Sequence, residues 1–234
     1  MFTVSIIIMV VGLLGVLVAA KLRQQPVAVL SAIIMLVGLG MYAWYTFNPP
    51  PNTDYIVFDK AVCSKMAKAL KGAGYSQAYW LTSEAASEYT QSRIANFKED
   101  FGGSVEVLAP NTSADGMIAE MDNNQFKELT KTIPADAIII IDMNLLDGGK
   151  MEFLKSSYKG PKVFFSASGS IMGAKKKAVI TAFEKGNIVG MIIYKSSTDD
   201  NFVPDDDNLD EAFNARYTLV DKNNVKANES NLPF

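Results

Sequence analysis

Two long runs of uncharged, mostly apolar residues occupy the first 47 positions of the chain. Residues 1–20 hold no charged side chain, and residues 27–47 form a second uncharged run. A helix of about 20 residues, rising about 1.5 Å per residue, spans a hydrocarbon core of about 30 Å. Inside lipid the backbone must satisfy its own hydrogen bonds, so both runs are predicted to be transmembrane helices. The expected hairpin has helices at about 3–20 and 27–47, joined by a loop at 21–26.

The connecting loop carries the only charges near these helices, Lys21 and Arg23. Cytoplasmic loops of membrane proteins are enriched in basic residues, so the loop 21–26 is predicted to be cytoplasmic. The N-terminus and everything after Phe47 then lie on the periplasmic or extracellular side of an inner or plasma membrane. The aromatic residues at the end of the second run match an interfacial belt on that side.

A cleaved signal peptide at residues 1–20 is the alternative interpretation, because Val18-Ala19-Ala20 is a tolerable cleavage motif. Two features favour the uncleaved hairpin. The opening sequence MFTVS has no basic residue, and a second apolar run follows.

Small residues are spaced for close helix packing within the two runs. Gly15 and Ala19 lie four apart in the first, and Ala28 and Ala32 lie four apart in the second. Such pairs let helix backbones approach closely, either within the hairpin or against a foreign helix. Neither run contains an ionisable residue, so the hairpin is interpreted as an anchor or packing element rather than an ion path.

A proline-rich linker at residues 48–53 separates the hairpin from the rest of the chain. Its three consecutive prolines favour an extended polyproline II spacer. All 25 acidic residues and 20 of the 22 basic ones follow it, which gives residues 54–234 a net charge of −5. This balance argues against a nucleic-acid partner. It also predicts that the domain avoids anionic lipid headgroups.

Short apolar strand patterns alternate with helical patterns in residues 54–234. Regular alternation with short loops predicts a mostly parallel sheet with helices on both faces. We therefore expect an α/β domain with a doubly wound, Rossmann-like sheet of five to six strands. The expected strands are 78–82, 105–109, 137–143, 163–166, 188–194 and 216–220, and the expected helices are 59–73, 84–100, 114–130, 148–158, 171–185 and 207–214.

Two stretches resemble one lobe of the type I periplasmic binding proteins. The first is KMAKALKGAGYSQAYWLTSEAASEYTQSRIANFKEDFGGSVEVLAP, in which Arg93 and Phe97 match a helix pattern of that family. The second is FKELTKTIPADAIIIIDMNLLDGGKMEFL. The resemblance covers about residues 60–195 and implies a Rossmann-like lobe with a small-solute site. Proteins of that family bind solute between two lobes, and this chain has room for one.

Polar side chains follow several of the expected strands. Open doubly wound sheets bind ligands in the crevice beyond the carboxyl ends of their strands. Hydroxyls and amides at those ends can hydrogen-bond a small solute, and they can equally cap the helices that follow. The ligand-binding candidates are Ser83, Asn111, Asn144, Ser168 and Ser170.

The composition excludes several kinds of chemistry. There is no histidine, so a Ser-His or Cys-His nucleophile pair and a histidine-ligated metal are absent. The single cysteine, Cys63, excludes an intramolecular disulfide and a CxxC metal site, and its helical setting among apolar neighbours is typical of inert core. The Ser/Gly-rich loop at 166–177 lacks the P-loop spacing, and no strand is followed by GxGxxG. We therefore predict no cofactor.

Acidic residues concentrate between positions 199 and 211. Asp205, Asp207 and Asp210 are candidate calcium ligands, although the EF-hand spacing is not met. The alternative is a solvated loop with a helix-capping aspartate. A separate acid, Asp142, ends the central strand, where it could hydrogen-bond a hydroxyl or an amine, but the sequence places no catalytic partner beside it.

These features predict a non-catalytic, membrane-anchored accessory or scaffolding subunit of a larger membrane assembly. Its expected partners are other membrane subunits and the lipid bilayer, with no nucleic acid. The alternative function is a membrane-tethered module that binds or senses a small solute at the strand ends. An enzyme is the third interpretation, and it would need a pocket with perturbed carboxylates.

Overall fold

The computed structural model describes residues 2–21, 25–47, 53–83, 87–109, 121–145, 148–171, 173–195 and 202–232. The chain divides into two compact units, Met1–Thr53 and Asp54–Phe234. Each unit is described by itself below.

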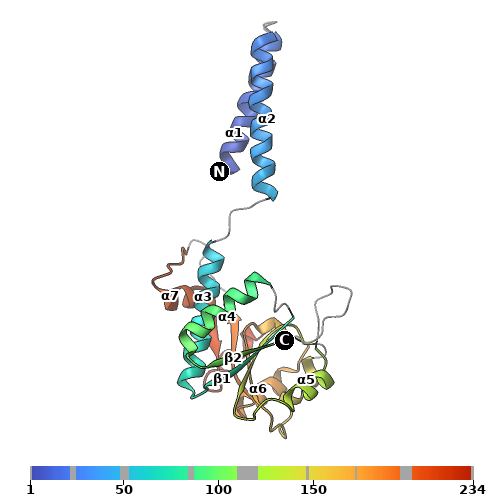
Figure 1. The fold of residues 1–234 in the computed structure, drawn as a ribbon, viewed down its shortest axis with the longest axis vertical. Coiled ribbons are helices and arrows are strands. Elements are labelled where there is room, and N and C mark those ends of the chain that lie inside the picture. Colours follow the sequence, from blue (N-terminus) through green and yellow to red (C-terminus); the bar gives the residue numbers. More distant parts are fainter. Residues whose placement is uncertain are drawn as a thin grey trace. The chain divides into compact units, whose positions relative to one another are not determined.

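The first unit is a pair of helices, α1 (Phe2–Lys21) and α2 (Gln25–Phe47), packed side by side (Figure 1). Glycines of α1 permit the close approach. A Cβ on Gly12 would lie 2.7 Å from the Met35 backbone nitrogen, and one on Gly15 would overlap the Ser31 side chain. The two helices therefore meet through backbone surfaces that any larger side chain would push apart.

The remaining predictions for this unit concern the small residues, the linker and the membrane span. Ala32 is half-buried, whereas the side chains of Ala19 and Ala28 and the linker residues 48–52 lie outside the described part of the chain. Within the residues that the structure describes, no helix has the length and apolar character needed to cross a membrane. The predicted transmembrane hairpin is thus not confirmed.

The second unit is built on one six-stranded sheet in the order β2-β1-β3-β4-β5-β6. Five strands are parallel, and β6 runs antiparallel to β5. The prediction of an α/β fold with a mostly parallel sheet is confirmed. The strands are β1 (Gln77–Thr82), β2 (Ser104–Leu108), β3 (Ile138–Asp142), β4 (Lys162–Phe165), β5 (Ile188–Tyr194) and β6 (Tyr217–Val220).

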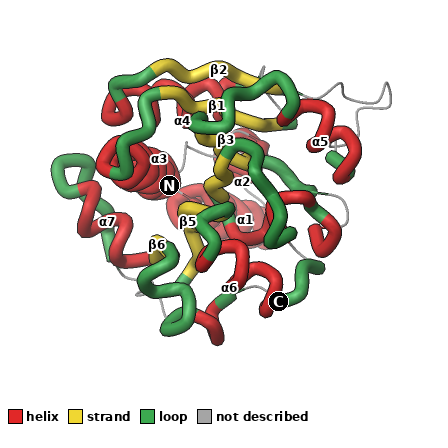
Figure 2. Tube along the Cα trace, turned by 90° about the horizontal axis from the view of Figure 1, so that it is seen from below, coloured by secondary structure: helices red, strands yellow, loops and turns green. Residues whose placement is uncertain are grey.

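Helices cover both faces of the sheet (Figure 1, Figure 2). One face packs against α3 (Thr53–Gly72), α4 (Glu88–Phe101) and α7 (Leu209–Arg216). The other packs against α5 (Asn123–Thr130), α6 (Lys176–Glu184) and the short 3₁₀ turns. The strand β3 lies between both layers, and Ile138 to Ile141 are fully buried. Its unbroken apolar run is the pattern of a parallel strand covered on both faces.

The predicted helix at 148–158 is wrong. The chain instead forms two 3₁₀ turns, η1 (Gly148–Lys150) and η2 (Glu152–Leu154). Tertiary hydrogen bonds take the backbone groups that a helix would use. The Asn187 Nδ2 donates to the carbonyls of Phe153 and Lys155 at 3.0 Å each, and the Asn123 Oδ1 accepts from the Glu152 amide at 2.8 Å.

Several helix starts also differ from the prediction, since α4 begins at Glu88 rather than at residue 84 and α6 at Lys176 rather than at residue 171. The helix α3 begins at Thr53 rather than at residue 59, within the predicted linker. The helix α5 begins after Asp122, which forms a capping box with Gln125. Thr112 and Ser113, the expected caps, lie in the stretch 110–120 outside the described residues.

Candidate functional site at the carboxyl edge of the sheet

A pocket of about 220 Å³ opens where β1 and β3 end. This is the edge at which open α/β sheets bind their ligands. We call it the carboxyl-edge pocket. It is lined by Thr82, Ser83, Tyr89, Thr90, Arg93, Asp142, Met143 and Asn144.

The base of the pocket is a buried arginine supplied by α4. Arg93 lies on the helix face that also carries the buried residues Ile94 and Phe97, so the amphipathic pattern of α4 turns its guanidinium into the domain. Arg93 Nη1 lies 2.5 Å from Asp142 Oδ1, and Arg93 Nε lies 3.2 Å from Asp59 Oδ1. The Arg93 Nε is buried and has no hydrogen-bond partner among the described residues. Its contact with Asp59 is therefore an ion pair without hydrogen-bond geometry. We call Asp59, Arg93 and Asp142 the ion triad.

Asp142 is held by donors from three directions. Besides Arg93, the Trp80 indole nitrogen donates to Asp142 Oδ2 at 3.1 Å, and the Ser166 hydroxyl donates to Asp142 Oδ1 at 2.5 Å. These donors come from β1, from α4 and from the end of β4. A buried carboxylate is stable only when it is paired and hydrogen-bonded, and Asp142 meets both conditions.

Aromatic rings cover the guanidinium. The Arg93 Cζ lies 5.7 Å from the ring centroid of Trp80 and 5.6 Å from that of Tyr89, within the range of cation–π attraction. The Tyr89 hydroxyl in turn lies 2.7 Å from that of Tyr55, and their rings stack with centroids 5.9 Å apart. The ion triad is therefore flanked by aromatic rings from β1, α3 and α4.

The pKa shifts reflect this burial. Burial raises the pKa of Asp59 despite the opposing pull of Arg93. Burial disfavours the charge of Arg93, but the carboxylates of Asp142 and Asp59 outweigh that effect and hold the pKa of Arg93 above its ordinary value. Burial also raises the pKa of Tyr89. The arginine thus stays charged, with its charge already matched by the chain's own acids.

The buried polar groups of the ion triad are directed at one another. Among the described residues, the Arg93 Nε is the one buried side-chain nitrogen or oxygen without a hydrogen-bond partner, and it lies 3.2 Å from Asp59 Oδ1. Over the described ranges of the chain, no group of three or more acidic or thiol side chains is placed to hold a metal ion. The pocket can donate and accept hydrogen bonds through the hydroxyls and the amide at its rim.

Some of the predicted ligand-binding residues line the carboxyl-edge pocket, and others do not or lie outside the description. Ser83 and Asn144 line the carboxyl-edge pocket together. Ser170 is buried, and its carbonyl accepts from the Leu145 amide, so it does not line the pocket. Ser168 begins η3 (Ser168–Ile171), with its side chain outside the description, and Asn111 lies outside the described residues.

The acidic segment is used for ion pairing with α3. Lys65 Nζ lies 2.9 Å from Asp210 Oδ1, and Lys60 Nζ lies 3.2 Å from Asp206 Oδ1. Asp205 accepts from the backbone amide of Asp207 at 3.0 Å, which is a local turn. The carboxylates of Asp205 and Asp210 thus have separate partners, and the three calcium candidates form no metal-binding group in the described part of the chain.

Sequence reasoning missed the role of Arg93 and the partners of Asp142. A usable signal was present, because Arg93 occupies an apolar-face position of α4 one residue before Ile94. A charge on a core-facing position requires a buried counter-charge. The distance between Arg93 and Asp142 along the chain hid the partner until the fold was known.

Cys63 is fully buried on α3, as its pattern predicted. Burial raises the pKa of Cys63 to about 12, outweighing the attraction of the nearby Arg93. At pH 8 such a thiol is ionised in about one molecule in ten thousand.

We expect a maleimide to leave Cys63 unmodified in the native chain and to modify it fully in concentrated urea, as measured by mass spectrometry. Equal rates in the two states would contradict the buried position.

The fold and the ion triad together define a doubly wound α/β domain whose carboxyl edge holds a buried arginine paired with two aspartates. One solved relative in fold is an ABC-transporter solute-binding protein from Bradyrhizobium sp. BTAi1 with bound bis-Tris. It is 13% identical with a TM-score of 0.40, over 76% of this chain and 55% of that one. A mutant of the XylFII–LytSN complex is 12% identical with a TM-score of 0.33, over 73% of this chain and 61% of that one.

The likeness to these structures is weak. The chain spans less than two thirds of the length of either protein. No protein-family model and no curated protein sequence matches the chain.

Proposed function

We propose that the chain is a non-catalytic, membrane-anchored accessory or scaffolding subunit that presents its α/β domain on the exoplasmic side of a membrane. The observation that carries the proposal is the ion triad. The carboxyl edge, where such a fold would bind a substrate, holds a buried arginine whose charge is already matched by Asp59 and Asp142.

The sequence of the first two helices supports membrane anchoring. It includes the residues of these helices whose side chains lie outside the description. Residues 1–20 and 27–47 carry no charge. The helix α1 is apolar on all its faces, which is typical of a helix surrounded by apolar material. Large side chains such as Leu17, Val29 and Leu36 are each about 60% exposed within the hairpin. An apolar surface of this extent requires lipid or another protein to cover it.

The topology is tested by cysteine labelling in intact cells. We choose two exposed positions, Lys159→Cys in the α/β domain and Gln25→Cys at the start of α2. An impermeant maleimide added outside is expected to label Lys159→Cys at once and Gln25→Cys only after the membrane is permeabilised. The native Cys63 serves as the internal control, since it is buried. The reverse labelling pattern would refute the exoplasmic placement.

The accessory role is tested by native mass. The chain is extracted from its own membranes under gentle conditions, and the mass of the particle is measured by native mass spectrometry. A subunit of an assembly is expected to appear with other chains bound. A particle holding only one 25.5 kDa chain would contradict the proposal.

The second candidate function is a small-solute binding or sensing module. The convergence of Ser83 and Asn144 on the carboxyl-edge pocket favours it. Ligand binding stabilises the folded chain by an amount that grows with the logarithm of the ratio of ligand concentration to the dissociation constant. A sugar, amino acid or anion that raises the melting temperature of the native chain, but not of Asn144→Ala, would support sensing over scaffolding.

A further inference from the structure

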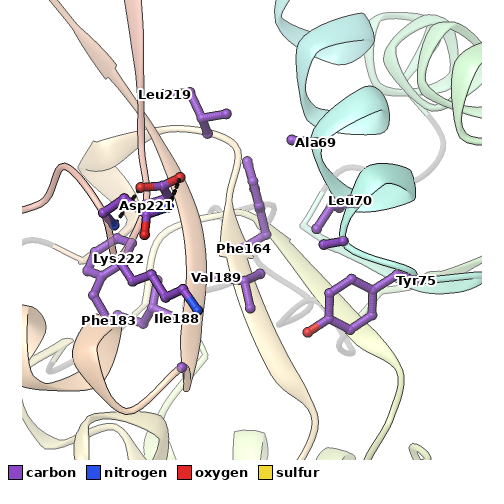
Figure 3. A pocket seen from close by; sticks show the side chains of 13 residues that line it. Ala69, Leu70, Tyr75, Phe164, Phe183, Ile188, Val189, Leu219, Asp221 and Lys222 are labelled. Carbon is purple, nitrogen blue, oxygen red and sulfur yellow. Dashed lines mark hydrogen bonds between the residues drawn. The ribbon is translucent and has the colours of Figure 1, made fainter.

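A second and larger cavity lies at the opposite edge of the sheet. It measures about 330 Å³ and is bounded by the end of α3, the start of β5 and the end of β6. Since β6 runs antiparallel, its last residues meet the amino ends of the parallel strands here. We call this cavity the amino-edge pocket (Figure 3).

The walls of the amino-edge pocket are mainly apolar. Leu70 comes from α3, Phe164 from β4, and Val189 and Leu219 from the two last strands. Phe183 closes the side near α6. A volume in this range with aliphatic and aromatic walls is typical of a site for a small organic molecule.

Two hydrogen-bond donors reach into this apolar space without partners. The Tyr75 hydroxyl and the Lys222 ammonium extend toward the middle of the pocket from opposite sides (Figure 3). In the described part of the chain neither group has a hydrogen bond or an ion pair. Tyr75 is half-buried, and its burial raises the pKa of its hydroxyl, so that group remains a donor.

Two acceptors at the pocket, the Asp221 carboxylate and the Leu70 carbonyl, are already engaged. Asp221 accepts from the amides of Asn223 at 2.7 Å and Asn224 at 3.2 Å, and from the Asn223 side chain at 3.3 Å. At the end of α3, the Leu70 carbonyl accepts from the Tyr75 amide at 3.1 Å. The pocket therefore offers two donors without partners among the described residues, the positive charge of Lys222 beside the hydrogen-bonded Asp221 carboxylate, and an apolar floor.

We propose that the amino-edge pocket binds a small carboxylate with an apolar body, its carboxylate between Lys222 and Tyr75 and its body against Phe164 and Val189. Such a ligand supplies acceptors for the Tyr75 hydroxyl and the Lys222 ammonium, which have no partner among the described residues. This site is separate from the carboxyl-edge pocket and uses none of its residues.

The test uses three probes with the same phenylpropyl body. They are 3-phenylpropionate, 3-phenylpropanol and 3-phenylpropylamine, whose head groups are a carboxylate anion, a neutral hydroxyl and an ammonium cation. Binding to the full-length chain in lipid nanodiscs is measured by ligand-observed NMR, with empty nanodiscs as the blank. The carboxylate is expected to bind about fivefold more tightly than the alcohol, the gain of one exposed ion pair. The amine is expected to bind least.

Matched variants locate the site. Lys222→Gln is expected to weaken carboxylate binding about fivefold and to leave alcohol binding unchanged. Tyr75→Phe is expected to weaken it by the few-fold that one hydrogen bond contributes. Ala69→Phe fills the pocket from α3 and should abolish binding of all three probes. Lys159→Gln, an exposed lysine away from the pocket, should change nothing.

Each outcome is decisive. No carboxylate binding to the wild-type chain would overturn the proposal. So would equal binding of the three probes with no effect of Lys222→Gln, because the head group would then play no part. Carboxylate binding that survives Ala69→Phe would place the site elsewhere.

Discussion

Replacing Arg93 with methionine is expected to lower the free energy of unfolding by about 3–5 kcal/mol. The substitution keeps a long side chain on α4 but leaves the Asp59 and Asp142 carboxylates without their shared cation. A buried charge that loses its partner carries its full desolvation cost. The measurement is urea unfolding of the full chain followed by Trp80 fluorescence, in a Trp44→Phe background.

Two further variants separate charge from packing in this prediction. Lys98→Met changes an exposed cation on the same helix and should cost less than about 0.5 kcal/mol. Adding Asp142→Asn and Asp59→Asn to Arg93→Met removes the stranded charges and should recover part of the loss. If Arg93→Met alone costs less than Lys98→Met, then the ion triad does not form in solution.

The second large effect is expected at Phe97. This side chain is fully buried between the Trp80 ring, at 5.4 Å between centroids, and the Phe101 ring, at 4.9 Å. Phe97→Ala removes those ring contacts and leaves a cavity between α4 and the sheet, so the free energy of unfolding should fall by about 3–5 kcal/mol. The same urea titration measures it.

Phe97→Leu is the matched control, because it keeps most of the apolar volume and should cost clearly less than Phe97→Ala. Phe97 and Arg93 both contact Trp80, so their effects should not add in a double variant. Strict additivity would indicate that Trp80 does not couple the two positions. A Phe97→Ala loss no larger than that of Phe97→Leu would contradict the packing described here.

Much of the second unit was predictable because its strands carry strong local patterns. The apolar run of β3 and the shorter runs of the other strands mark all six elements to within a residue or two. Short connections then restrict the topology to a mostly parallel sheet. The predicted helix at 148–158 failed for a non-local reason, since Asn187 lies more than 30 residues from the carbonyls it holds.

The candidate sites were only partly predictable. Ser83 and Asn144 follow adjacent strands, so the rule for carboxyl ends placed both at one pocket. Asp142 was visible as an acid at a strand end, but its partner lies 49 residues away on α4. The amino-edge pocket depends on the reversed direction of β6, which brings Lys222 opposite Tyr75.

The sequence by itself determined the division of the chain into an apolar helical pair and an acidic α/β domain, together with the order of the strands and of most of the helices. These follow from hydrophobic periodicity, charge distribution and the conformational limits of glycine and proline, which act over a few neighbouring residues. Only the tertiary structure decided that Arg93 is neutralised by Asp59 and Asp142, and that unused donors gather at the amino edge. The pairing of charges and the shape of cavities depend on which distant segments of the chain meet. Local sequence patterns do not specify which segments those are.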